Sequence, residues 1–265
     1  MIQLLKGLAR TVVAAVEGSI ILPWAAWRGW RSTIYPIRPI DLRFPLGYQD
    51  EDAIRGALEI AAPYTVLSLD RLASLWWQIG WLDRAGVAGA MVECGVRMGG
   101  ASAMMAMAHM ANANPPVRRL HLFDRFEGVP EPAAIDGEWA AQIVADLKRK
   151  PLDINPEIAR ALLVERARFP ESLIHFHVGW FKDTMPAAAA DIGPIALLRL
   201  DSDWYESTKI CLELLYDRLV PGGLLVVDDY MQFPGCKRAV DEFLARRPPL
   251  MPHRIDLVGW YWVKP

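Results

Sequence analysis

The 265-residue sequence predicts an α/β fold, in which a mainly parallel sheet carries helices on both faces. From about residue 50 onward, short apolar runs alternate with longer segments of helical periodicity. The runs are continuously apolar, which is typical of parallel strands buried on both faces. They also end on acidic residues or glycine turns, as strands do where an open parallel sheet binds its ligand.

Five apolar runs are expected to form the parallel strands, because each is short and bounded by turn residues. The C-terminal segment 253–265 is expected to supply two closing strands around Gly259. The five predicted strands cover residues 89–95, 118–124, 172–180, 195–201 and 222–229.

Helical segments separate these strands. Residues 68–86 predict the longest helix, with Ser68 or Asp70 as N-cap and Gly86 as the stop signal. The other predicted helices cover residues 50–61, 101–112, 207–219 and 236–247. Residues 130–170 interrupt the alternation, with helical stretches at 138–150 and 156–167 but no clear strand. We expect a lid-like helical insertion over the ligand edge of the sheet.

The first 49 residues form an apolar, tryptophan-rich extension ahead of a main domain at residues 50–265. Glu17 and Pro23 interrupt its apolar stretch, which is too short to match the about 20 residues that span a membrane. Glu17 also disfavours a signal peptide, because it falls where the apolar core of one would lie. A peripheral membrane contact through a surface helix and a contact between subunits both remain open.

Composition limits the partners and the compartment. The net charge of −2 argues against nucleic-acid binding, which requires a basic surface. The three cysteines are far apart and show no CxxC spacing, so a zinc site or a disulfide framework is not expected. A cytoplasmic location fits these cysteines best.

The first predicted strand ends on Glu93, and a turn containing Gly95 and Gly99 follows. It is not the dinucleotide-binding fingerprint, because Glu93 stands where that motif needs a glycine. A carboxylate there suits a ligand with a positive group, and Asp124 ends the next strand, placed to accept hydrogen bonds from two ribose hydroxyls. Together they indicate a nucleoside with a cationic tail, such as S-adenosylmethionine (SAM). A plain tight turn is the alternative.

Three carboxylates are expected to converge further along the same edge. Asp201 ends the fourth predicted strand, and Asp228 and Asp229 end the fifth. Like charges in a partly dry crevice repel one another unless a cation lies between them, and oxygen ligands suit Mg²⁺. Otherwise they are solvated loop acids, one of which caps the next helix.

Five segments closely resemble the macrocin O-methyltransferase (TylF/MycF-like) family over residues 64–263. They read MVECGVRMGG, LFDRFEGVP, HVGWFKDTMP, LLRLDSDWYEST and LVPGGLLVVDDYMQFPGCKRAVDEF. The resemblance implies a Rossmann-like class I methyltransferase sheet, SAM and Mg²⁺ as cofactors, and a homo-oligomer. It also implies Asp201, Asp228 and Asp229 as the metal ligands.

The site residues follow from the pattern and the resemblance together. Asp201 is the first candidate for the general base, with His175 or His177 as alternatives. Tyr205 and Glu206 are expected to contact the substrate. The expected cofactor contacts are Tyr64, Thr65, Glu93, Gly95, Gly99, Ser102, Asp124, Phe126, Gly179 and Trp180.

Structural roles compete with several of these assignments. Tyr64 and Thr65 could cap the following helix, and the Trp180 ring could pack in the core. Tyr205 and Glu206 could serve only the start of a helix, and the two histidines could make half-buried polar contacts. Lys182 and Asp183 are expected to form a solvated turn.

The sequence therefore predicts an Mg²⁺-dependent O-methyltransferase acting on a sugar hydroxyl of a glycosylated natural product or a polysaccharide. A methyltransferase for vicinal aromatic hydroxyls would use the same metal site, and a non-catalytic scaffold could keep the fold. A sugar-modifying dinucleotide oxidoreductase is disfavoured by Glu93 and the missing fingerprint. The 259–262 stretch, GWYW, departs from the arginine-containing stretch often found there in the family, so the acceptor is less well defined than the cofactor.

Overall fold

A computed structural model describes residues 51–113, 116–149 and 154–265 of the chain. The predicted N-terminal extension, residues 1–49, lies outside these ranges. So do the alternatives of a membrane-surface helix and a subunit contact within it. None of the helices in the described ranges is both long enough and apolar enough to cross a membrane.

The described residues form a seven-stranded sheet with the order β3-β2-β1-β4-β5-β7-β6. β1 to β5 are parallel, β7 pairs antiparallel with β5, and β6 pairs antiparallel with β7. The predicted class, the five parallel strands and the two closing strands around Gly259 are confirmed. The strands are β1 (Ala90–Cys94), β2 (Leu120–Asp124), β3 (Ile174–Val178), β4 (Ile195–Leu200), β5 (Leu219–Val227), β6 (Pro252–Arg254) and β7 (Trp260–Val263).

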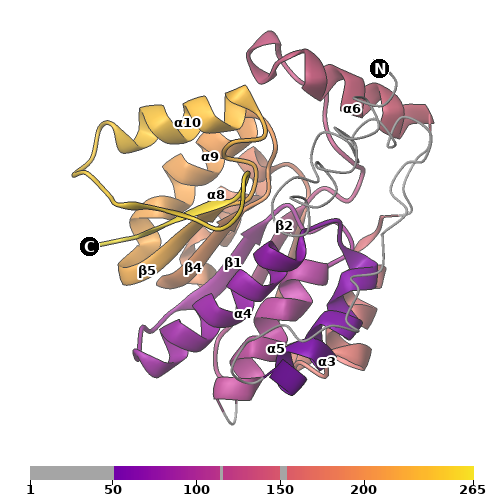
Figure 1. The fold of residues 1–265 in the computed structure, drawn as a ribbon, viewed down its shortest axis with the longest axis vertical. Helices are drawn as coiled ribbons and strands as arrows, with labels where there is room; N and C mark the ends of the chain where they lie inside the picture. Colours follow the sequence, from indigo (N-terminus) through magenta and orange to yellow (C-terminus); the bar gives the residue numbers. More distant parts are fainter. Residues whose placement is uncertain (1–50, 114–115, 150–153) are drawn as a thin grey trace, which may run out of the picture. The chain divides into compact units, whose positions relative to one another are not determined.

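Helices cover both faces of this sheet (Figure 1). Met91 and Val92 are adjacent in β1 but belong to two different buried cores, one on each face. The first face carries α3 (Glu51–Ala61), α4 (Leu69–Arg84) and α5 (Gly100–Asn112). The second carries α8 (Phe181–Ile192), α9 (Tyr205–Leu215) and α10 (Pro234–Leu244).

α4 begins at the predicted cap. The hydroxyl of Ser68 accepts a hydrogen bond from the backbone N–H of Arg71 at 3.2 Å, so Ser68 rather than Asp70 is the N-cap. Gly86 follows the helix with a φ of +67°, a left-handed conformation that glycine adopts at low cost.

α8 corrects one prediction. Lys182 and Asp183 are exposed to solvent as predicted, but they lie in the first turn of this helix and not in a loop turn. Pro186 inside the helix removes a backbone hydrogen bond and argues against a helix in the sequence. The alanines at 187–190 favour the helix, and burial of its apolar side chains against the sheet stabilises it further.

The predicted insertion at 130–170 holds the expected helices. Trp139 stacks on Phe233, which precedes α10, with ring centroids 5.1 Å apart. Ala159 lies against Gly99, where an added Cβ would come within 3.0 Å of the Ala159 Cβ. The insertion therefore contacts elements on both faces of the sheet, while a lid movement stays a prediction. The helices are α6 (Glu138–Arg149), α7 (Pro156–Ala161) and a π-helical turn (Leu162–Arg166).

The central strands end together at one edge. The backbone N–H of Asp201 donates to the carbonyl oxygen of Cys94 at 2.8 Å, and that of Asp228 donates to Leu200 at 2.8 Å. The hydrogen-bond ladder between β1, β4 and β5 therefore extends one residue past β4, to Asp201, and one residue past β5, to Asp228. The sheet itself fixes the backbone of these candidate site residues.

Candidate active site

The turn between β1 and α5 is the centre of the candidate site. Gly95 has a φ of +93°, and a Cβ atom there would overlap the carbonyl oxygen of Asp201, so only glycine fits. Gly100 lies against the segment before α4, since a Cβ there would lie 2.6 Å from the Cβ of Thr65. The turn therefore brings together the ends of β1 and β4 and the start of α4.

Asp124, at the end of β2, holds this turn in place. Its Oδ2 accepts from the backbone N–H groups of Val96 at 2.7 Å and Arg97 at 2.8 Å. Its Oδ1 accepts from the N–H of Phe126 at 2.8 Å. Three of the about four lone-pair positions of a carboxylate are thereby used. The structure leaves one position for a hydroxyl, fewer than the two that the sequence predicts.

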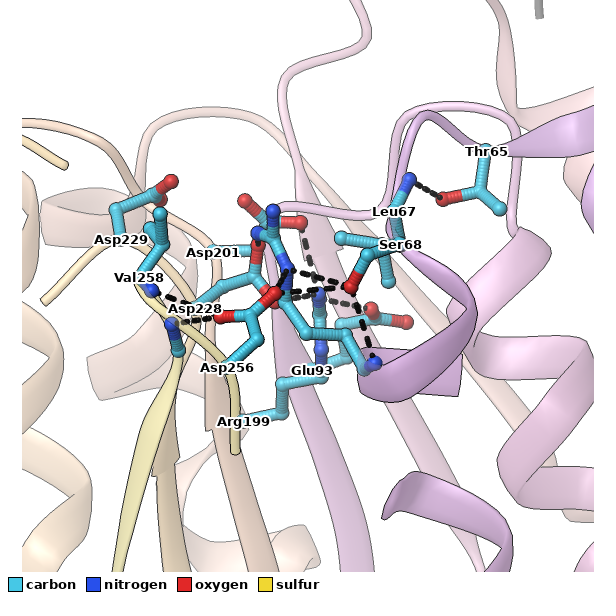
Figure 2. A network of polar contacts seen from close by, with 12 residues as sticks. Thr65, Leu67, Ser68, Glu93, Arg199, Asp201, Asp228, Asp229, Asp256 and Val258 are labelled. Atoms are coloured by element: carbon cyan, nitrogen blue, oxygen red, sulfur yellow. Dashed lines mark hydrogen bonds and ion pairs between the residues drawn. The ribbon is translucent and has the colours of Figure 1, made fainter. Parts of the chain in front are cut away.

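Tyr64 and Thr65 lie beside this turn and do not cap α4, because Ser68 does. The hydroxyl of Thr65 accepts from the backbone N–H of Leu67 at 3.2 Å (Figure 2). The hydroxyl of Tyr64 accepts from Arg166 at 3.2 Å. The capping alternative is therefore wrong, and a cofactor contact at these two residues stays a prediction.

Glu93 is only 1% exposed and is paired within the protein. Arg199 Nη1 donates to its Oε1 at 2.6 Å, and the hydroxyl of Ser102 donates to Oε2. Burial raises the pKa of Glu93 to about 7, although both contacts favour its charged form. The positive partner of Glu93 is thus Arg199, a residue that the sequence analysis did not consider. Direct contact of Glu93 or Ser102 with the cofactor stays a prediction.

Arg199 of β4 pairs with two further carboxylates. Its Nη1 lies 3.0 Å from Asp201 Oδ2, and its Nη2 donates to Asp228 Oδ1 at 2.8 Å (Figure 2). The sequence did contain a signal for this role. A charged residue inside the buried run IALLRL must find partners, because an unpaired buried charge is very costly.

The second oxygen of Asp228 is paired with Arg71 Nη1 from the first turn of α4. Arg71 Nε in turn donates to Asp256 Oδ2 at 3.0 Å, and the hydroxyl of Ser68 donates to the same oxygen at 2.9 Å. Arg71 and Asp256 were missed by the sequence analysis. They are far apart in the chain, and no local pattern marks either of them.

Asp201, Asp203 and Asp229 form a compact acidic cluster. One carboxylate oxygen from each lies within 4.8 Å of the other two. Burial raises the pKa of all three, and neighbouring carboxylates, including Asp228, raise it further. Of the predicted trio, Asp201 and Asp229 lie in this cluster, whereas the two oxygens of Asp228 are paired with Arg71 and Arg199. Asp203 belongs to the cluster as an acid to which the sequence analysis assigned no role.

The described part of the site carries more negative than positive charge. If every group is ionised, seven carboxylates and three guanidinium groups leave an excess of four negative charges, which protons or a bound cation must balance. The carboxylates are Glu93, Asp124, Asp201, Asp203, Asp228, Asp229 and Asp256, and the guanidinium groups are Arg71, Arg97 and Arg199.

Three more predicted cofactor residues lie near Asp124. Phe126 is buried, with a φ of +54°, and Gly179 donates its N–H to the carbonyl oxygen of Asp124 at 3.0 Å. Trp180 is 48% exposed, and the guanidinium of Arg125 lies 4.4 Å from its ring centroid. Core packing is therefore excluded for Trp180, while its contact with the cofactor stays a prediction.

Tyr205 and Glu206, the predicted substrate residues, lie in the first turn of α9. The hydroxyl of Tyr205 donates to Glu242 of α10 at 2.7 Å, and its backbone N–H donates to Asp136 at 2.8 Å. The Glu206 side chain is exposed. Tyr205 therefore serves the helix start, and substrate contact at both residues stays a prediction.

His175 and His177, the alternative bases, form a stack with His121 of β2. The ring centroids of His175 and His177 lie 4.6 and 5.4 Å from that of His121, and His121 Nδ1 is 3.1 Å from His177 Nε2. Burial lowers the pKa of all three rings. The stack lies within β2 and β3, whereas Asp201 follows β4 at the ligand edge, which favours Asp201 as the base.

This sheet order, with a glycine turn after β1 and acids after β2, β4 and β5, is that of a class I methyltransferase, and the chain is a SAM-dependent O-methyltransferase. It belongs to the macrocin O-methyltransferase (TylF) family, whose model matches residues 48–264.

Curated relatives support this assignment. The chain is 36% identical over 200 residues, 75% of each chain, to the 8-demethyl-8-(2,3-dimethoxy-alpha-L-rhamnosyl)-tetracenomycin-C 4'-O-methyltransferase of Streptomyces olivaceus. It is 31% identical over 203 residues, 75% of this chain and 78% of the relative, to the mycinamicin III 3''-O-methyltransferase of Micromonospora griseorubida.

Solved structures share the fold. The O-methyltransferase NovP superposes with a TM-score of 0.67 at 32% identity, over 76% of this chain and 82% of that one. An O-methyltransferase from Bacillus cereus in complex with SAH has a TM-score of 0.51 over 83% of this chain and 93% of that one. At 16% identity, this second likeness shows the fold alone.

Proposed function

We propose that this enzyme transfers the methyl group of SAM to a sugar hydroxyl of a glycosylated natural product or a polysaccharide, with Mg²⁺ bound among the acidic residues. The close packing of Gly95 on the backbone of Asp201 carries the proposal. It joins the turn expected to receive the cofactor to the carboxylates expected to receive the metal and the acceptor.

The residues around the turn fit SAM. Asp124 keeps one acceptor position for a ribose hydroxyl, and the exposed ring of Trp180 offers a stacking surface for a purine. Thr65 borders the turn at Gly100. The excess negative charge of the site favours the sulfonium and ammonium groups of this cofactor.

The donor set also fits a hard divalent cation. Asp201, Asp203 and Asp229 are close enough together to hold Mg²⁺, and Asp228, which the resemblance implies as a further ligand, would join them. The raised pKa values of Asp201, Asp203 and Asp229 reflect the cost of placing like charges together, which a cation would offset. When bound, the metal would supply a Lewis acid that makes an alcohol more acidic.

Asp201 is proposed as the general base. Its carboxylate lies in the acidic cluster that would hold the metal, so it would be close to a hydroxyl bound there. It would take the hydroxyl proton as the oxygen–carbon bond forms and the carbon–sulfur bond of SAM breaks. The turn at Gly95 and the acidic cluster would contribute chiefly by holding the two reactants in line.

The acceptor class rests on the relatives. One is named for a rhamnosyl-tetracenomycin and its 4'-O position, and another for the 3''-O position of mycinamicin III. Each alignment covers 75% of this chain. Tyr205 and Glu206 follow Asp201 closely in the chain, and we assign them to the acceptor side of the site.

Calorimetric titration tests the cofactor and the metal separately. SAM is titrated into the purified wild type, once with Mg²⁺ and once with EDTA. The same titration is made with the double variant Asp228→Asn/Asp229→Asn. We expect SAM binding in all three cases and metal binding only in the wild type. Absence of SAM binding under every condition would refute the methyltransferase function and favour a scaffold.

An acceptor screen tests the substrate class. Glycosides and catechols are incubated with SAM and Mg²⁺, and products are analysed by mass spectrometry. We expect methylated glycosides that are lost with EDTA. Methylation of catechols alone would instead support the enzyme for vicinal aromatic hydroxyls.

A further inference from the structure

Arg71 joins two carboxylates from distant parts of the chain. Its Nη1 pairs with Asp228, which follows β5, while its Nε donates to Asp256 at 3.0 Å. Asp256 lies in the turn between β6 and β7. The two ends of one planar guanidinium are therefore fixed by two different elements.

Asp256 is itself held rigidly by its own turn. Its Oδ1 accepts from the backbone N–H groups of Val258 at 2.8 Å and Gly259 at 2.7 Å. Its Oδ2 accepts from the hydroxyl of Ser68, the N-cap of α4, at 2.9 Å. With Arg71 as the fourth donor, this carboxylate can turn only if several hydrogen bonds break together.

Gly259 provides a second, uncharged contact with Arg71. A Cβ atom at this position would lie 3.1 Å from Arg71 Cδ and 3.4 Å from Arg71 Cγ. The turn therefore packs directly against the aliphatic stem of Arg71. The contact between the turn and Arg71 therefore depends on the shape of the turn as well as on the charge of Asp256.

Asp228 is the residue that this arrangement constrains. Arg71 holds one of its oxygens and Arg199 holds the other, and its side chain is only 5% exposed. The side chains of Arg71 and Arg199 are 15% and 1% exposed, so both ion pairs are poorly solvated. Removing one partner would leave an uncompensated buried charge.

We propose that Arg71 is a positioning residue that sets the orientation of the Asp228 carboxylate for a divalent cation, and that the β6–β7 turn holds Arg71 in place through Asp256 and Gly259. The inference rests on the proposed function, because the cation is part of it. In this arrangement the β6–β7 turn stabilises the metal site, although it contributes no metal ligand itself.

The geometry of Arg71 is more important here than its charge. A guanidinium reaches two carboxylates through separate nitrogens in a fixed plane, whereas a lysine offers one flexible ammonium. Arg71→Lys keeps the positive charge but cannot bridge Asp228 and Asp256 in the same way. Gly259→Ala keeps every charge and should displace the Arg71 stem.

The test measures Mn²⁺ binding to the purified full-length protein by electron paramagnetic resonance, together with SAM binding by calorimetry. For both Arg71→Lys and Gly259→Ala we expect the dissociation constant for Mn²⁺ to increase about tenfold. The dissociation constant for SAM should stay within about twofold. In turnover, kcat should fall about ten- to hundredfold with little change in KM for SAM.

Two matched variants control for general destabilisation. Arg118→Lys alters another buried arginine, which pairs with Asp83 at 2.6 Å and lies 7% exposed away from the site. Gly56→Ala adds a methyl group where a Cβ would meet nothing within 4 Å. Neither should change Mn²⁺ binding, even if Arg118→Lys lowers the melting temperature.

The possible outcomes distinguish a failure of the positioning role from a failure of the proposed metal-dependent function. If the wild type binds Mn²⁺ and the Arg71→Lys or Gly259→Ala variant binds it equally well, the positioning role is overturned and the proposed metal site is not. A wild type that fails to bind Mn²⁺ overturns the proposed metal site and the positioning role with it. Weaker binding in both variants but not in the controls supports the inference.

Discussion

At the scale of single residues, Asp203 combines an unfavourable backbone with an unfavourable charge. Its φ of +60° places a non-glycine residue in the left-handed region, at a cost of about 1 kcal/mol. Its carboxylate lies within 4.8 Å of those of Asp201 and Asp229. Strained residues of this kind cluster at functional sites, so the Asp203 carboxylate itself is expected to matter.

Asp203→Asn should weaken Mn²⁺ binding about tenfold, or about 1.4 kcal/mol. Asparagine also tolerates the left-handed region, so the change removes the charge and leaves the backbone conformation accessible. Electron paramagnetic resonance of Mn²⁺ measures the effect. Asp183→Asn, an exposed site on α8, is the control. Unchanged Mn²⁺ affinity in Asp203→Asn would exclude this carboxylate from the metal site.

Gly95→Ala should be far more destabilising than Gly86→Ala. Both glycines have positive φ, so both variants carry backbone strain, but only at Gly95 would the Cβ overlap another residue, Asp201. We expect losses in unfolding free energy of about 3 kcal/mol at Gly95 and about 1 kcal/mol at Gly86. Urea denaturation measures both. Equal losses would mean that the contact with Asp201 adds no constraint.

At the scale of elements, the stacked histidines join the edge strand β3 to β2. His121 is fully buried, and its Nε2 and that of His175 have no hydrogen-bond partner among the residues that the structure describes. Arg119 and Asp191 are the charged groups that act on the stack. Arg119 disfavours protonation, while Asp191 favours it at His175 and His177. The pairing of β3 with the sheet thus depends on histidines that stay neutral.

Acidification should therefore weaken this edge of the sheet. Burial, and then His175 and His177, lower the pKa of His121 from 6.5 to about 3. Between these two pH values, His121 binds a proton in the unfolded chain but not in the folded one. Its contribution to stability is therefore complete above pH 6.5 and is lost as the pH falls towards 3. At about pH 4.5, two pH units below the unfolded pKa of 6.5, the loss from His121 is about 2.7 kcal/mol.

Denaturant unfolding of the wild type and His121→Phe across this pH range measures the effect. The variant keeps an aromatic ring and should show a shallower decline in stability as the pH falls. His253→Phe on β6 is the control and should follow the wild type. A decline as steep in His121→Phe as in the wild type would show that the stack does not control acid stability.

At the scale of the whole molecule, cofactor binding should stabilise the fold, because the candidate site draws on β1, β2, β4 and α4 together. At a concentration one hundred times its dissociation constant, a ligand adds about 2.7 kcal/mol. For S-adenosylhomocysteine we expect the melting temperature to rise by about 5–10 °C. Asp124→Asn should reduce this shift, and its absence in the wild type would contradict the placement of the cofactor site.

The sequence was sufficient for most of the fold. The parallel strands, their acidic ends and the Ser68 cap follow from local patterns that tertiary packing reinforces. α8 could not be predicted this way, because Pro186 masks a helix that burial of Met185 and Ala188 stabilises. The adjacency of Asp201 to Asp228 was predictable, since it depends only on neighbouring strands.

The charge partners of the site were much less predictable. Arg199 is marked by its place inside an apolar run, but its choice of three carboxylates depends on side-chain geometry. Arg71 and Asp256 meet only because α4 begins beside the last turn of the sheet. Such contacts between segments distant in the sequence leave no periodic pattern in it.

The bond between α4 and the C-terminal turn has a practical consequence for recombining enzymes of this family. A hybrid with its crossover between β5 and β6 would take Arg71 from one parent and Asp256 from the other. If the parents differ at either position, the hybrid inherits a buried charge without its counterpart. Crossover points placed before the Ser68 cap of α4 keep both residues from one parent and preserve the ion pair.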